Sequence, residues 1–334
     1  MIGPLLLFSF SPLSITTMNL RSSSLTSIAG LLALSFVATT PNAHGCASCG
    51  CSLASDWEVQ GYSIEPGLKL DINFNYLDQS QYRHGTRHIS TLEVPEGQEL
   101  ERNTVTSTTT LNLDYIFNSD WAMSLQVPWI SRNHGTFGEE HEELDTSSTD
   151  SIGDIKLMGR FQGFTKSHNF GVELGIKLPT GVHDDTFSSG EGLDRGLQPG
   201  TGTTDFVAGL YYFDSFAENW GYFAQINVQT PFNSRDGYRP GTAENVNVGV
   251  RYTGLGSIIP QLQLNGRIAS RDRGENADVL NSGGSMIYVS PGVTYEVTRQ
   301  LSTYVFVQVP LYQNLNGYQL APTWQLTAGV RYSF

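Results

Sequence analysis

The sequence predicts an all-β protein, an antiparallel transmembrane β-barrel of about twelve strands. Three observations support this fold. Apolar and polar residues alternate along most of the chain after residue 61, the strands so predicted are joined by alternately short and long links, and the last strand ends in an aromatic residue at the carboxyl terminus, Phe334.

The composition agrees with this fold. Charged residues make up 15% of the 334 residues and aromatic residues 11%, with 35 glycines and a mean hydropathy of −0.21. Because lipid-facing and lumen-facing residues alternate in a membrane barrel, mean hydropathy stays near neutral. The formal net charge of −13 excludes nucleic acid as a partner and is compatible with a surface that attracts cations.

The amino-terminal residues 1–43 are predicted to be a secretory signal peptide. Arg21 gives a positive start, residues 28–37 are apolar but too short to span a bilayer, and small residues follow up to Ala43. Met18 is an alternative start of translation. A second interpretation is a lipoprotein signal, in which Cys46 would be acylated.

Residues 44–61 are predicted to form a periplasmic segment that contains all three cysteines, Cys46, Cys49 and Cys51. Thiolates at this CxxCxC spacing suit zinc or copper(I), so a metal cofactor is possible here. In an oxidising periplasm a disulfide competes with metal binding, and an odd number of cysteines leaves one over unless Cys46 carries lipid.

Residues 62–334 are predicted to form the barrel. Period-two alternation is clear at Leu68, Leu70 and Ile72, which are separated by lysine and aspartate, and again where Val246 and Val248 alternate with asparagine and glycine. The twelve predicted strands are 68–76, 105–117, 121–129, 155–161, 170–178, 206–212, 220–230, 246–252, 262–268, 287–297, 301–311 and 324–334.

The links between these strands indicate how the barrel is oriented. Five are short, at 118–120, 165–167, 214–219, 254–257 and 298–300, and five are long, at 79–104, 131–152, 180–202, 232–242 and 270–283. Outer-membrane barrels have short periplasmic turns and long outer loops, and every long link follows an odd-numbered strand. A soluble β-sandwich, the competing fold, predicts no such asymmetry.

The closing strand also carries a predicted assembly signal. Tyr332 and Phe334 end a run of alternating apolar residues, which resembles the signal that the barrel-assembly machinery recognises in bacterial outer-membrane proteins. This resemblance implies that the assembly machinery and outer-membrane lipid are partners and that the protein is located in the bacterial outer membrane.

Ten charged residues fall on the lumen-facing phase of the predicted strands. Mixed charges of this kind either pair across a filled interior or line a narrow channel, and no ring of one sign is evident. These residues are Asp71, Lys156, Arg160, Glu173, Lys177, Asp205, Arg251, Arg267, Glu296 and Arg331.

Histidines fall in the predicted outer loops and strand ends, with carboxylates nearby. They could bind a divalent cation, but we favour a hydrated acidic loop without metal. No residue is assigned to catalysis, because no serine–histidine pair lies on one face of neighbouring strands, and the protein is not expected to be an enzyme.

Residues 151–213 resemble the meta-pathway phenol-degradation family of outer-membrane proteins. The most recognisable segments are Leu-Pro-Thr-Gly at 178–181 and Gln-Pro-Gly-Thr-Gly at 198–202. The resemblance implies a transporter-like barrel, in some members linked to the uptake of aromatic compounds.

The expected function is therefore a porin-like channel or transporter for a small-molecule solute, with aromatic or hydrophobic compounds suggested by the family resemblance. One alternative is a non-conducting barrel that serves binding or envelope structure. Another is metal handling through the CxxCxC segment.

Overall fold

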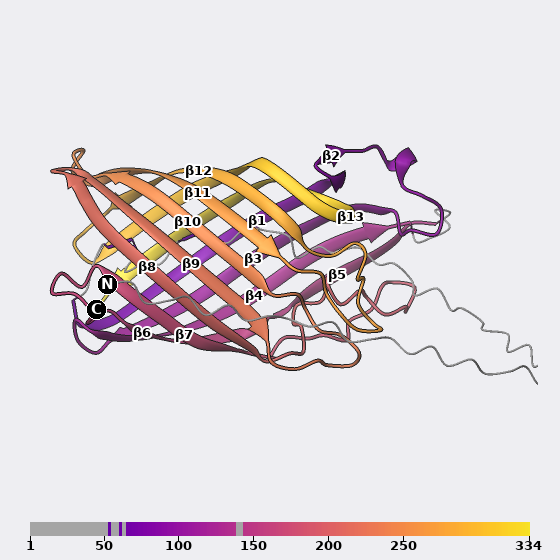
Figure 1. Cartoon of the computed structure of the whole chain (residues 1–334), viewed down its shortest axis with the longest axis horizontal. Helices are drawn as coiled ribbons and strands as arrows, with labels where there is room; N and C mark the ends of the chain where they lie inside the picture. The colour runs from indigo at the N-terminus through magenta and orange to yellow at the C-terminus, as the bar shows by residue number, and fades with distance from the viewer. Residues whose placement is uncertain (1–52, 55–59, 62–64, 138–142) are drawn as a thin grey trace, which may run out of the picture. The chain divides into compact units, whose positions relative to one another are not determined.

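The structure is a computed structural model, and it describes residues 53–54, 60–61, 65–137 and 143–334. The strands form a single antiparallel sheet that closes on itself through pairing of β13 with β1 (Figure 1). The elements in chain order are β1 (Gly67–Gly85), β2 (Arg87–His88), the short 3-10 helix η1 (Thr91–Glu93), β3 (Glu101–Ile116), β4 (Trp121–Thr136), β5 (Asp145–Ile152), β6 (Ile155–Phe161), β7 (Phe170–Leu178), β8 (Asp205–Ala217), β9 (Trp220–Pro231), β10 (Ala243–Tyr252), β11 (Ile258–Ala269), β12 (Gly284–Glu296) and β13 (Leu301–Ser333).

The predicted all-β antiparallel barrel is confirmed, and about twelve strands is approximately right. β13 pairs with β12 up to Leu315 and with β1 from Leu315 onward, so the chain reverses direction within this element. Gly317, with φ +60°, lies at the reversal, where a left-handed backbone favours glycine. β5 and β6 pair with successive parts of the same neighbour, β4.

Strands β1 and β4 extend beyond the predicted ends at residues 76 and 129, to Gly85 and Thr136. Much of the two long links predicted at 79–104 and 131–152 is therefore sheet, including β5. These extensions lack apolar alternation because both faces of a strand meet water once it leaves the bilayer, whereas its backbone pairing continues.

The outward face of the barrel is apolar. On β10, Val246 and Val248 are 43% and 48% exposed, whereas Asn245 and Asn247, which alternate with them, are buried. Aromatic pairs lie at the ends of strands, including Trp121 with Phe161, whose ring centroids are 4.6 Å apart. An apolar belt with aromatic residues at its edges matches the hydrocarbon core and the interfaces of a bilayer.

Candidate functional site in the barrel interior

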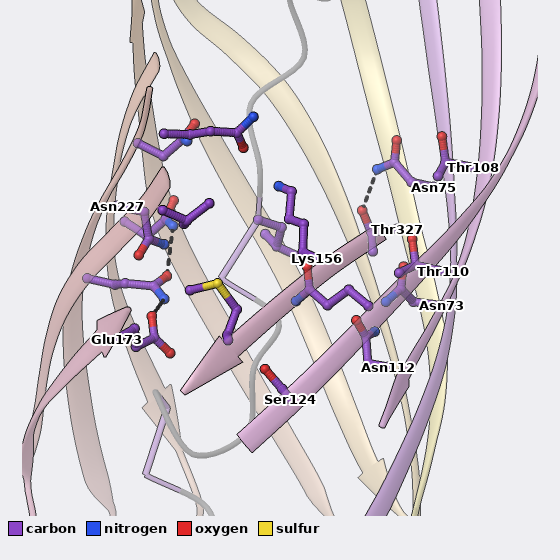
Figure 2. A pocket seen from close by; sticks show the side chains of 18 of the residues that line it. Asn73, Asn75, Thr108, Thr110, Asn112, Ser124, Lys156, Glu173, Asn227 and Thr327 are labelled. Carbon is purple, nitrogen blue, oxygen red and sulfur yellow. Dashed lines mark hydrogen bonds between the residues drawn. The ribbon is translucent and has the colours of Figure 1, made fainter. Parts of the chain in front are cut away.

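The candidate site is the polar interior of the barrel, which the inward-facing residues of the strands form. A central cavity of about 400 Å³ lies between the walls, lined mainly by amide and hydroxyl side chains (Figure 2). Its lining includes Leu53, Asn73, Asn75, Leu77, Thr108, Thr110, Asn112, Ser124, Gln126, Lys156, Met158, Arg160, Glu173, Val207, Gln225, Asn227, Gln229, Asn245, Asn247, Arg267, Gln325 and Thr327.

These side chains are polar because they occupy the inward-facing positions of their strands. On β11, Gln263 and Asn265 are fully buried, whereas Leu262 and Leu264 on the opposite face are exposed to the membrane side. Neighbouring strands connect the amides, since Asn265 Nδ2 donates to Asn247 Oδ1 at 2.8 Å. The interior is thus a hydrogen-bonding surface rather than an apolar core.

Four of the predicted lumen-facing charges line this cavity: Lys156, Arg160, Glu173 and Arg267. Arg160 lies 3.7 Å from a carboxylate oxygen of Glu173 and 3.8 Å from one of Asp114. The described residues of the interior carry charges of both signs, and the lining of the central cavity holds three cations and one carboxylate.

A second group of predicted charges closes the seam between β1 and β13. The Asp71 carboxylate accepts hydrogen bonds from Arg331 Nε at 2.6 Å and from Asn73 and Asn112 at 3.0 Å each. Tyr304 donates its hydroxyl to the same carboxylate at 3.1 Å, and its ring centroid lies 4.4 Å from the Arg331 guanidinium. This buried cluster is positioned to fix the register of the closing strands.

A third group anchors the long link 179–204 at one end of the barrel interior. Lys177 Nζ contacts Asp154 at 2.7 Å and Asp205 at 3.2 Å, and all three side chains are buried. Asp154 in turn accepts hydrogen bonds from the backbone amides of Gly181 and Thr201, at 3.1 and 3.0 Å.

This cluster explains the two sequence segments on which the family resemblance depends. Gly181 of Leu-Pro-Thr-Gly lies directly against Gly200 of Gln-Pro-Gly-Thr-Gly, and a Cβ on Gly181 would come within 2.7 Å of the Gly200 backbone. Only glycine permits two backbones to approach this closely. The predicted lumen-facing charges included Lys177 and Asp205 but not Asp154, which directly precedes β6.

A second cavity of about 240 Å³ lies between the link 179–204 and the ends of β9, β11 and β12 that are nearest to this link. It shares Gln229 and Arg267 with the central cavity. Arg132 of its wall donates to the backbone carbonyl of Leu197 at 2.5 Å. The two cavities therefore succeed one another through the interior, with Arg267 where they meet.

Parts of the segment before the barrel also lie against the inner wall. Arg251 donates to the carbonyls of Gln60 and Gly61, the latter at 3.2 Å, and Gln263 Nε2 donates to the carbonyl of Ala54 at 3.2 Å. Ala54 and Gln60 are each 2% exposed. The described residues of the predicted periplasmic segment thus occupy space within the barrel, while its boundaries remain a prediction.

The remaining predicted residues are placed as follows. Glu296 is exposed at the end of β12, away from the cavity lining. Tyr332 and Phe334 contact each other with ring centroids 4.8 Å apart, and Phe334 N donates to Leu68 O at 3.0 Å. The three cysteines and the predicted signal peptide lie outside the described residues. Within the described ranges, no group of three or more histidine, cysteine, aspartate or glutamate side chains could hold a metal.

Comparisons with known proteins show the fold alone. No family model and no curated protein match the sequence, so the phenol-degradation resemblance remains a prediction. An outer-membrane channel from Pseudomonas putida F1 has a similar structure, with a TM-score of 0.62, 11% identity, and coverage of 81% of this chain and 97% of that one.

Two other solved structures are more distant. A deletion mutant of TodX, a monoaromatic hydrocarbon channel, has a TM-score of 0.48 and 11% identity, over 80% of this chain and 90% of that one. The KdgM porin in complex with oligogalacturonate has a TM-score of 0.41 and 12% identity, over 80% and 99%.

The described residues contain no helix long and apolar enough to cross a membrane. The closed antiparallel sheet, its apolar outward face and the likeness to an outer-membrane channel agree with one another. The chain is an outer-membrane β-barrel of the bacterial cell, as its alternating strands predicted.

Proposed function

We propose that this protein is an outer-membrane channel for small hydrophilic solutes. The observation that carries the proposal is the pair of adjoining cavities inside a closed barrel, lined mainly by amides and hydroxyls, that meet at Gln229 and Arg267. Amide and hydroxyl groups replace the hydrogen bonds that a polar solute makes to water, whereas they give an apolar solute little.

Aromatic or hydrophobic solutes, which the family resemblance suggests, form a competing class. The side chains around the central cavity include only a few apolar ones, such as Leu77, Met158 and Val207. Apolar ligands bind pockets lined predominantly by apolar and aromatic side chains. We therefore rank polar solutes first and treat an aromatic solute as the comparison arm of the test.

The test compares two substitutions at adjacent positions of β4. Ser124 lines the cavity, whereas Met123 is 43% exposed on the outward face. Purified full-length protein in liposomes should admit small sugars and conduct ions, and Ser124→Trp should reduce both. Met123→Trp should reduce neither. Swelling with phenol but not with sugars would overturn the choice of solute class, and equal conductance of the two variants would overturn the assigned route.

A non-conducting barrel is the second candidate. It is favoured by the link 179–204, which Asp154 holds at one mouth of the barrel, and by Gln60 and Gly61, which lie against the inner wall. A wild-type protein that inserts fully but neither conducts nor admits sugars would support this function. Metal handling through Cys46, Cys49 and Cys51 stays a prediction that zinc or copper titration of the full chain under reducing conditions would test.

The barrel-assembly machinery also stays a predicted partner. Deleting Phe334 should lower the yield of inserted barrel in cells, measured by the fraction that resists proteolysis in isolated outer membranes.

A further inference from the structure

Among the described residues, no carboxylate forms a salt bridge with two of the cations that line the central cavity, Lys156 and Arg267. Lys156 makes no hydrogen bond or ion pair to any other described residue, and Figure 2 shows its side chain extending into the cavity between opposite walls. Arg267 donates to Asn245 Oδ1 at 3.3 Å, but its Nε is buried without a partner. The nearest carboxylates, those of Asp154 and Asp205, act on Lys156 only through space, because both are in direct contact with Lys177 instead.

Further polar atoms of the lining are buried without partners. The Nε2 of Gln325, a side chain 1% exposed, and the Oδ1 of Asn227 make no hydrogen bond within the described structure. Leaving such an atom unpaired is unfavourable, so these groups indicate where a ligand would gain hydrogen bonds. They are one donor and one acceptor in the lining of the same cavity as the two cations.

The chemistry of these groups specifies a ligand class. A guanidinium and an ammonium both bind carboxylates, the guanidinium through a planar pair of N–H donors. Amide side chains donate and accept, which matches hydroxyl groups that also do both. The cavity of about 400 Å³ lies within the range of sites for small organic molecules.

We propose that the central cavity is a binding site for small organic anions that carry hydroxyl groups, such as sugar acids, with Lys156 and Arg267 holding the carboxylate. The amide lining, with Gln325 and Asn227 among it, holds the hydroxyls. This inference rests on the proposed channel function and names the class of solute that the channel selects.

Binding is tested with gluconate as the probe, by calorimetry on the detergent-solubilised full chain. Gluconate should bind more tightly than glucose, which lacks the carboxylate, and more tightly than benzoate, which lacks the hydroxyls. Lys156→Gln and Arg267→Gln should each weaken gluconate binding about tenfold, the effect of losing one charge-assisted contact. Lys166→Gln, the same change at an exposed turn residue, should leave it unchanged.

Conductance is measured on the same proteins in planar bilayers with a potassium chloride gradient. The reversal potential should show a preference for chloride that the double variant Lys156→Gln/Arg267→Gln loses, and gluconate should reduce the chloride current. A channel that conducts without anion preference and binds no gluconate would overturn this inference and leave the channel function standing. Gluconate binding without conductance would instead overturn the channel function. Benzoate binding as tightly as gluconate would overturn the assignment of the amides to hydroxyl groups.

Discussion

The Asp71 cluster makes a prediction about how the barrel is held closed. Asp71→Asn is expected to lower the free energy of unfolding by about 3 kcal/mol, because breaking a buried ion pair by removing one partner costs about 3–5 kcal/mol. The side chains of Asp71 and Arg331 are both nine-tenths buried or more, and the carboxylate accepts hydrogen bonds from four side chains. An asparagine there has one acceptor oxygen and would turn an NH2 group toward other donors.

The measurement is equilibrium urea unfolding from lipid vesicles, followed by tryptophan fluorescence, with ΔG obtained by linear extrapolation. Asp78→Asn, on the same strand, is the matched control. Asp78 accepts from the hydroxyls of Ser80 and Thr323, both at 2.8 Å, and its substitution should cost less than about 1 kcal/mol. A loss below about 1 kcal/mol at Asp71 would refute the assigned role in closing the seam.

A double substitution tests whether the stability of the seam depends on the charge balance of the cluster or on its shape. Asp71→Leu with Arg331→Met removes both charges, and such replacements of buried ion pairs are often tolerated. The double variant should therefore be more stable than Asp71→Asn alone. If it is instead less stable, the shape of the cluster matters more than its charge balance.

Three further predictions concern the links and the interior segment. Lys177→Met should leave Asp154 and Asp205 facing each other without their shared cation, and faster amide hydrogen exchange in 179–204 should report release of the link. Arg251→Gln should weaken docking of Gln60 and Gly61 about tenfold, seen as faster proteolysis of the folded protein near Gly61. Burial raises the pKa of the Asp272 carboxyl above its ordinary 3.8, so the folded state binds more protons than the unfolded state just above that pH. The stability of the link 270–283 should therefore fall as pH rises through this window. Hydrogen exchange of the link measures this pH dependence, which Asp272→Asn should remove.

The strands could be predicted because the membrane constrains each outward-facing side chain separately. Lipid requires apolar side chains on one face, so Val246 and Val248 reveal their strand and its phase without knowledge of its neighbours. Beyond the bilayer this rule ends, and the sequence accordingly gave no sign that β1 continues to Gly85 or that β5 exists.

The pairing of charges inside the barrel could not be predicted. The alternation of apolar and polar residues along each strand places Asp71, Lys177 and Arg331 in the interior. Which cation meets which carboxylate depends instead on the register of the whole sheet. Asp71 and Arg331 lie at opposite ends of the chain and meet only because β13 closes on β1. The position of Ala54 and Gly61 was equally hidden, since the wall holds them mainly through their backbone carbonyls, which every sequence carries.

The net charge of the chain and the charge of its interior point in opposite directions. With 32 acidic against 19 basic residues, composition suggests a surface that attracts cations, yet the central cavity is lined by three cations and one carboxylate. A charge on the outer surface is screened within about 10 Å at ordinary ionic strength, whereas one in a narrow cavity acts directly on a solute that has lost part of its water. Selectivity should therefore follow Lys156 and Arg267 rather than the total charge. Raising the salt concentration should screen the attraction of cations to the loops before it screens the preference of the cavity for anions.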